Sequence, residues 1–182
     1  MGTSHLVLYD GGMTDENCTT TTVRMFPDYA DTVLWLVFPI DYEDTGLSPD
    51  LIHQLDAWEQ SYYEALDADF NWKSAEEART FTQTGIDLAG QVANELGEEF
   101  VVEFASYEHH APTYTVQSRS PADNDEAFAA FSTIVAELDA EDVRAAQLVA
   151  EAGPDGEWTA YAPLSGETFT PGKHVPRTED VD

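Results

Sequence analysis

The chain has 182 residues, 42% of them hydrophobic, so the length fits one domain with an apolar core and the composition excludes a disordered chain. It carries 36 Asp and Glu against 7 Lys and Arg, a formal net charge of −29 at pH 7. This charge excludes ordinary binding to the nucleic-acid backbone and to anionic membranes, because both surfaces repel it. We therefore predict no direct nucleic-acid binding and no membrane association.

The cellular setting follows from two further features. The longest apolar run, Val33–Phe38, is as long as a strand and far shorter than the roughly 20 residues of a membrane-spanning helix. No positively charged segment followed by an apolar stretch opens the chain. Cys18 is the only cysteine, which excludes an intramolecular disulfide. Together these features predict a reduced, cytoplasmic setting.

Three β-strands are expected in the N-terminal third. His5–Tyr9 is a short apolar run that ends in the turn Asp10–Gly12. Thr19–Phe26 is rich in β-branched residues. Thr32–Phe38 is nearly all apolar, which predicts a central strand covered on both faces and ended by Pro39.

The middle third predicts two antiparallel helices joined by the loop 67–73. Ser48–Asp50 and Ser74–Glu77 have the composition of helix N-termini, the second as a capping box, and Gly97 that of a C-terminus. Apolar residues then recur at spacings of three and four, as one face of a helix requires. In the first helix the stripe is Leu51, Leu55, Trp58, Tyr62 and Leu66. The polar residues Asp56, Glu59, Gln60 and Glu64 of that helix point away from this stripe. In the second helix the stripe is Ala78, Phe81, Gly85, Leu88, Val92 and Leu96.

The last part of the chain alternates strands and helices. Phe100–Ala105 and Thr113–Ser118 are expected to pair as neighbouring strands. A helix is expected to open at Ser120, Pro121 and Asp123 and to carry Phe128, Phe131, Ile134, Val135 and Leu138. A second helix is expected to be capped by Asp139–Asp142 and to run to about Glu151. A final short strand is expected at Trp158–Ala162.

These elements predict an α+β fold, with a mixed or antiparallel sheet covered by the antiparallel helix pair and followed by a helical C-terminal section. We expect one α+β domain over residues 1–162, in which 120–162 forms the helical section. Residues 163–182 contain Pro163, Pro171 and Pro176 among polar neighbours, which predicts an extended C-terminal tail.

A series of short motifs runs through the central stretch: Leu47–Leu51, Leu55–Trp58, Phe70–Trp72, Glu76–Arg79, Leu88–Ala89 and Glu95–Gly97. Over about residues 47–105 this pattern resembles small acidic proteins of high-GC actinobacteria. The resemblance implies an immunity or regulatory partner protein, and no catalytic residue set comes with it. The low arginine content departs from that group and leaves a halophilic source open.

The densest group of potential metal ligands is Glu103, Glu108, His109 and His110. Adjacent histidines in a strand point to opposite faces, so both reach one ion only from an irregular loop. The sequence has no H-E-x-x-H motif, no nucleophile elbow and no phosphate-binding glycine loop. We predict no bound metal and no other cofactor. The alternative is a small metal-assisted hydrolase that combines His109 and His110 with Asp41 or Asp44.

Aromatic side chains beside carboxylates suit the binding of a basic protein, because Arg and Lys meet both ring faces and charges. Tyr63 lies off the apolar stripe of the first helix, and Phe70 and Trp72 lie in the interhelix loop. We predict these three as anchors of a partner-binding surface, with Asp67 and Asp69 as the charges that steer encounter.

The leading functional hypothesis is a non-enzymatic acidic binding protein, of the immunity, inhibitor or regulatory type, that acts on a basic protein surface. Two alternatives stay open. One is the metal-assisted hydrolase; the other is a halophile protein whose charge only reflects adaptation to salt.

Overall fold

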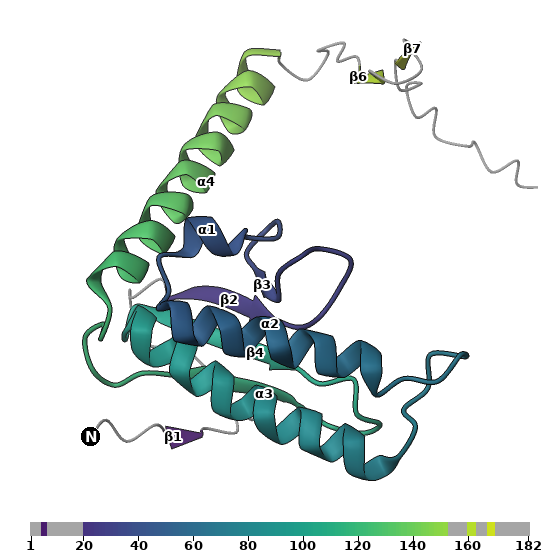
Figure 1. The fold of residues 1–182 in the computed structure, drawn as a ribbon. Helices are drawn as coiled ribbons and strands as arrows, with labels where there is room; N and C mark the ends of the chain where they lie inside the picture. The colour runs from purple at the N-terminus through teal and green to yellow at the C-terminus, as the bar shows by residue number, and fades with distance from the viewer. Residues whose placement is uncertain (1–4, 7–19, 153–159, 163–166, 170–182) are drawn as a thin grey trace, which may run out of the picture. The chain divides into compact units, whose positions relative to one another are not determined.

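The computed structural model describes residues 5–6, 20–152, 160–162 and 167–169, and its contacts divide the chain into two compact units, 1–135 and 136–182 (Figure 1). The predicted α+β class is confirmed. The elements in chain order are β1 (His5–Leu6), β2 (Thr21–Met25), β3 (Leu34–Trp35), α1 (Tyr42–Thr45), α2 (Pro49–Glu64), α3 (Ala75–Leu96), β4 (Phe100–Ala105), β5 (Thr113–Gln117), α4 (Asp125–Ala152), β6 (Ala160–Ala162) and β7 (Glu167–Phe169).

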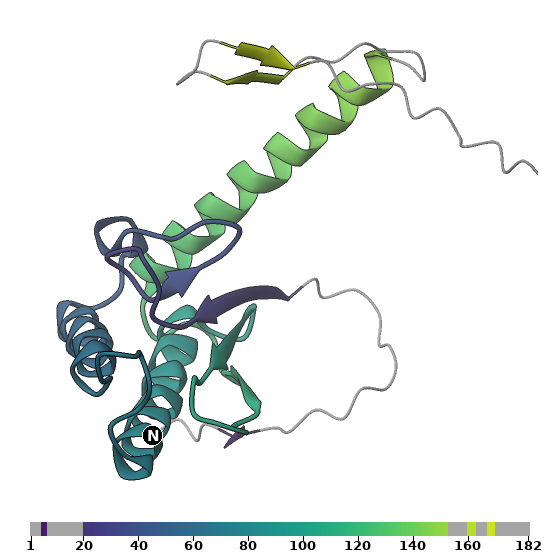
Figure 2. The same cartoon turned by 90° about the vertical axis from the view of Figure 1, so that its right-hand side faces the viewer.

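The first unit is built on a mixed sheet with the strand order β1-β5-β4-β2-β3. Strands β2 and β4 are parallel, with Val23 opposite Val102, and the other pairs are antiparallel. A parallel pair needs a long crossover connection. Here α2 and α3 lie within that connection, and both views show α3 beside β4 (Figures 1 and 2).

The predicted antiparallel helix pair is confirmed, and aromatic packing joins it to the sheet. The Trp58 ring of α2 stacks on Phe81 of α3 at 4.5 Å and meets Phe104 of β4 edge-on at 5.5 Å. The Trp58 indole N–H donates to the Phe81 carbonyl at 3.0 Å. All three side chains are buried. The α2–α3 pair is therefore fixed to the sheet at a well-packed aromatic contact.

Both helices begin where the cap motifs predict, but the two caps differ. At α3, the Ser74 hydroxyl oxygen accepts from the Glu77 N–H at 3.1 Å and bonds the Glu77 carboxylate at 2.8 Å. At α2, Ser48 makes no side-chain cap. Its hydroxyl and its N–H instead donate to the Glu95 carboxylate at the far end of α3, so Ser48 fixes the helix pair rather than its own helix.

The prediction of a central strand over Thr32–Phe38 is wrong. The strand is reduced to Leu34–Trp35, and it lies at the edge of the sheet, paired with β2 alone. The chain then turns back, because the Ile40 N–H donates to the Leu34 carbonyl at 2.9 Å. Val37, at this turn, is 82% exposed. An apolar run therefore shows neither that every side chain in it is buried nor that its strand is central.

The two predicted C-terminal helices are one helix, α4. Its N-terminal cap is Asn124, whose side-chain oxygen accepts from the N–H groups of Glu126 and Ala127, and not Ser120 or Asp123. The acidic stretch 139–142 contains no glycine or proline, and its side chains are exposed, so nothing interrupts the helix there. The acidic stretch 139–142, which was predicted to cap a second helix, is therefore an exposed turn in the middle of α4.

The second unit contains the later turns of α4 and the hairpin of β6 and β7, which pair antiparallel with Tyr161 opposite Thr168. Strand β6 falls within the predicted strand Trp158–Ala162. Cys18, the turn Asp10–Gly12 and most of the predicted C-terminal tail lie outside the described residues.

Candidate protein-binding surface

A cluster of aromatic rings lies where the C-terminal end of α2, the start of α3 and the β4–β5 loop meet. The Trp72 ring packs against Tyr62 at 5.5 Å and against Phe81 at 5.3 Å. Tyr62 also contacts the Tyr107 ring at 5.2 Å. The Trp72 indole N–H donates to the Tyr107 carbonyl at 3.0 Å. Trp72 is consequently half-buried, and it joins the interhelix loop to the sheet-side loop as well as presenting part of its ring to solvent.

The interhelix loop is organised by the carboxylate of Asp67. One of its oxygens accepts from the N–H groups of Asp69 and Asn71, and these hydrogen bonds lower the pKa of Asp67. The loop turns at Phe70, whose φ is 61°, a left-handed conformation that is uncommon for a bulky residue. The Phe70 side chain is 83% exposed. The loop thus holds a large apolar side chain in water on a constrained backbone.

The connection between β2 and β3 is held against this cluster by two tyrosine hydroxyls. Tyr63 of α2 donates to the Asp28 carbonyl at 2.6 Å, and Tyr107 donates to the Pro27 carbonyl at 3.1 Å. Beside these anchors, Tyr29 is 84% exposed. The surface therefore extends from the interhelix loop to a segment about 35 residues earlier in the chain.

Negative charge surrounds Tyr63. Glu59, one helical turn earlier, is only 4% exposed, so the prediction that it points away from the buried face of α2 is wrong. Burial first, and then the charges of Asp56 and Asp31, raise the pKa of Glu59 from 4.5 to about 7, against the lowering effect of its hydrogen bond with Tyr63. A carboxyl group with this pKa is about half protonated at neutral pH.

The tyrosines of the cluster experience the same field. Burial is the first cause that raises the pKa of Tyr62, Tyr63 and Tyr107, and the charge of Asp28 adds to all three. In the described part of the chain the only ion pair is Arg144–Glu141 on α4, and the charge of Lys73 in the interhelix loop acts on Asp67 without forming an ion pair. Burial and then the carboxylates of this surface therefore raise the pKa values of its tyrosines and of Glu59.

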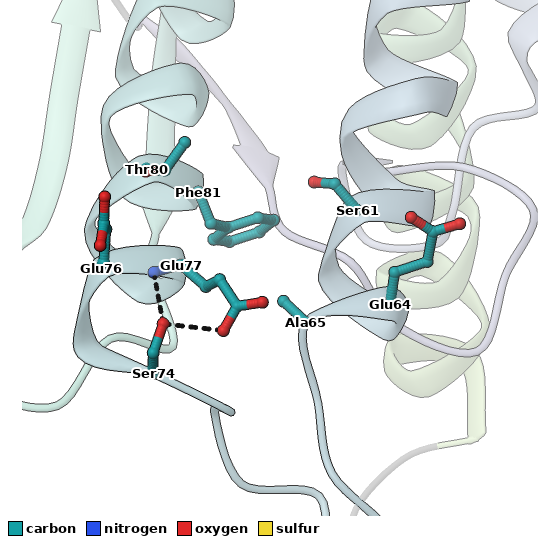
Figure 3. Close-up of a pocket in the computed structure, with 8 residues that line it drawn as sticks. All are labelled: Ser61, Glu64, Ala65, Ser74, Glu76, Glu77, Thr80 and Phe81. Carbon is teal, nitrogen blue, oxygen red and sulfur yellow. Dashed lines mark hydrogen bonds between the residues drawn. The ribbon is translucent and has the colours of Figure 1, made fainter.

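A hollow lies between the C-terminal end of α2 and the N-terminal end of α3, with Phe81 between the two helices (Figure 3). It is lined by Ser61, Glu64, Ala65, Ser74, Glu76, Glu77, Thr80 and Phe81. Its serine hydroxyls are engaged, Ser61 with the Trp58 carbonyl and Ser74 with Glu77. The hollow offers the carboxylates of Glu64, Glu76 and Glu77 to a cation, and its lining residues include neither a histidine nor a cysteine.

The predicted histidine loop is exposed. The rings of His109 and His110 contact each other at 3.8 Å, and His110 has a φ of 66°. Glu108 donates its N–H to the Ser106 hydroxyl at 3.1 Å. Within the described ranges, no three or more His, Cys, Asp or Glu side chains are grouped to hold a metal ion, and this includes the combination of the histidines with Asp41 or Asp44.

The structure places the sequence-predicted partner residues at one end of the helix pair. Tyr63, Asp67, Asp69 and Phe70 are exposed, and Trp72 is half-buried. Tyr29, Asp28 and Glu59 were missed. Asp28 contacts Tyr63, and Tyr29 contacts Trp35, only through the tertiary fold, so no local sequence pattern predicts either contact. For Glu59 a signal exists, since it follows the buried Leu55 by four residues and so continues the apolar face.

None of the helices that the structure describes is long and apolar enough to cross a membrane. No curated protein matches the chain significantly. Residues 21–107 match the family model described as Serratia CdiI immunity protein-like. This segment begins at the first residue of β2 and ends at Tyr107, so it includes the β2–β3 connection, α2, the interhelix loop and the aromatic cluster. The part of the chain that carries the candidate surface is therefore similar to a family of immunity proteins.

Proposed function

We propose that this chain is a non-enzymatic acidic binding protein of the immunity type, which acts in the cytoplasm by binding a basic surface of a toxin protein. The observation that carries the proposal is the match of residues 21–107 to an immunity-protein family model, because that segment coincides with the exposed aromatic and acidic surface. An immunity protein needs a binding surface, and this region supplies exposed aromatic side chains beside carboxylates.

The binding surface has two parts with different roles. Phe70 and Tyr63 supply exposed aromatic area, with 83% and 47% of their surface accessible, and such side chains are typical anchors of protein interfaces. Asp69 belongs to the charges that attract a basic partner from a distance. Trp72 and Asp67 support the surface as well, because Trp72 holds the loop to Tyr107 and Asp67 organises the turn.

The test is the affinity of the purified chain for a candidate basic toxin domain from the same genome. We expect Phe70→Ala to weaken binding by about 2 kcal/mol, or roughly 30-fold in Kd, mainly through faster dissociation. The melting temperature should stay unchanged, because the side chain is exposed. Leu148→Ala is the matched control, since it removes a 66% exposed apolar side chain from α4, outside the matched segment.

The charge on the loop is tested by Asp69→Asn, which should slow association at low salt and leave dissociation nearly unchanged. Asp142→Asn on α4 removes an exposed carboxylate elsewhere and serves as its control. Equal effects of Phe70→Ala and Leu148→Ala would reject this surface. A wild-type protein that binds no toxin domain would reject the immunity function itself.

A further inference from the structure

The β2–β3 connection contains an exposed aromatic side chain on a fixed support. The Tyr29 ring meets Trp35 edge-on at 5.5 Å, and Trp35, itself only 7% exposed, stacks on Phe26 at 5.2 Å. The adjacent backbone is held by the hydroxyls of Tyr63 and Tyr107. Because these contacts fix the segment before any partner arrives, little conformational entropy remains to be lost when something binds to Tyr29.

Carboxylates flank this ring. Asp28 precedes Tyr29, and its carboxylate accepts from the Tyr29 backbone N–H at 2.9 Å, which holds the carboxylate at the backbone of Tyr29. Asp31 follows two residues later, is exposed, and lies close enough to Glu59 to raise its pKa. Across the described residues, no lysine or arginine forms an ion pair with Asp28, Asp31 or Glu59.

We propose that Tyr29, Asp28 and Asp31 form a receptor site for an arginine side chain of the partner protein. The inference rests on the proposed function and deepens it, because it names the chemical group that this surface takes. A guanidinium group is planar, so it stacks on a tyrosine ring while its N–H groups bond carboxylates. A lysine ammonium is a compact, strongly hydrated charge that uses the ring less well.

The site differs from the surface around Phe70 in what it recognises. Phe70 offers apolar area to any complementary partner, whereas the Tyr29 site requires a cation. Residues 28–31 belong to the matched segment 21–107, and they reach the interhelix surface through the bond from Tyr63 to the Asp28 carbonyl. One partner could therefore contact both, with its arginine at Tyr29 and its apolar area at Phe70.

The experiment is an NMR titration of the isotopically labelled full chain with a short capped peptide of alternating glycine and arginine, at physiological ionic strength. The same peptide with lysine is the comparison. We expect the largest shifts at residues 28–31 and at Glu59 and Tyr63, with the arginine peptide binding roughly two- to fivefold tighter than the lysine peptide. Tyr29→Ala should abolish this preference, and Tyr29→Phe, which keeps the ring, should retain it.

The outcomes separate the two proposals. Shifts spread evenly over the acidic surface, equal affinity for both peptides, or unchanged binding by Tyr29→Ala would each overturn the arginine site. If a toxin domain binds the wild-type chain while the arginine peptide leaves residues 28–31 unshifted, the proposed function stands and the site is rejected. If the peptide binds at Tyr29 and no toxin domain binds, the site stands and the immunity function is rejected.

Discussion

Replacing Gly85 with alanine should lower the free energy of unfolding by about 2 kcal/mol, although alanine is the better helix former. Gly85 lies in α3 where the helix crosses the aromatic contact with the sheet. A Cβ atom there would come within 2.5 Å of the Phe104 ring and 2.7 Å of the Trp58 ring. Both rings are buried, 0% and 3% exposed, so neither can move away without disturbing the core.

The control is Gly90→Ala, the same change at a half-buried position of the same helix. We expect this variant to gain up to about 1 kcal/mol from helix propensity. Denaturant unfolding of the two variants and the wild type measures both effects. If Gly85→Ala gains as much stability as Gly90→Ala, the close packing of α3 on Trp58 and Phe104 is refuted.

The helix pair could be predicted from sequence because its signals are local. The proline at Pro49, the box at Ser74 and the glycine at Gly97 each act within one turn, and the helices begin and end at those residues. The apolar stripes also predicted the buried faces, including Gly85, but not why that position is glycine. The answer depends on Phe104, which is brought to α3 only when β4 joins the sheet.

Other features depend on contacts between distant residues and escaped prediction for that reason. In the sequence, Glu95 cannot be distinguished from the other acidic residues near helix ends. In the fold its carboxylate accepts hydrogen bonds from Ser48 and from the side chain of Asn124, which join the start of α2, the end of α3 and the start of α4. A single sequence in which every segment is acidic cannot show which carboxylate has this structural role.

The residues of the candidate surface also fall into two groups, those that local sequence predicts and those that depend on contacts between distant residues. Phe70 was predicted from its place in a loop between two capped helices, and its exposure agrees with that place. Tyr29 lies in the β2–β3 connection, whose local sequence has no feature that distinguishes it from an ordinary polar turn. Its importance arises because Tyr63 and Tyr107 hold that connection, through hydrogen bonds that span 35 and 80 residues. The aromatic residues of the surface could be found from sequence only where local structure alone decides their exposure.

Replacing Glu59 with glutamine should stabilise the folded protein at pH 8 and have little effect at pH 4.5. The pKa of Glu59 is raised from 4.5 to about 7 in the folded state, first by burial and then by Asp56 and Asp31. Below pH 4.5 the carboxyl is protonated in both folded and unfolded chains, so its titration costs nothing. Between pH 4.5 and 7 the unfolded chain loses the proton first, and wild-type stability falls as the pH rises.

Above pH 7 the full cost of the buried charge remains, on the order of 3 kcal/mol, which glutamine avoids because it carries no charge. The measurement is the difference in unfolding free energy between Glu59→Gln and the wild type across this pH range, which cancels the titration of the many other carboxylates. Glu64→Gln removes an exposed carboxylate from the same helix, and its difference should stay flat. A flat difference for Glu59→Gln as well would mean that the pKa of Glu59 is the same in the folded and unfolded chains. Burial and the charges of Asp56 and Asp31 would then not act on Glu59 as described.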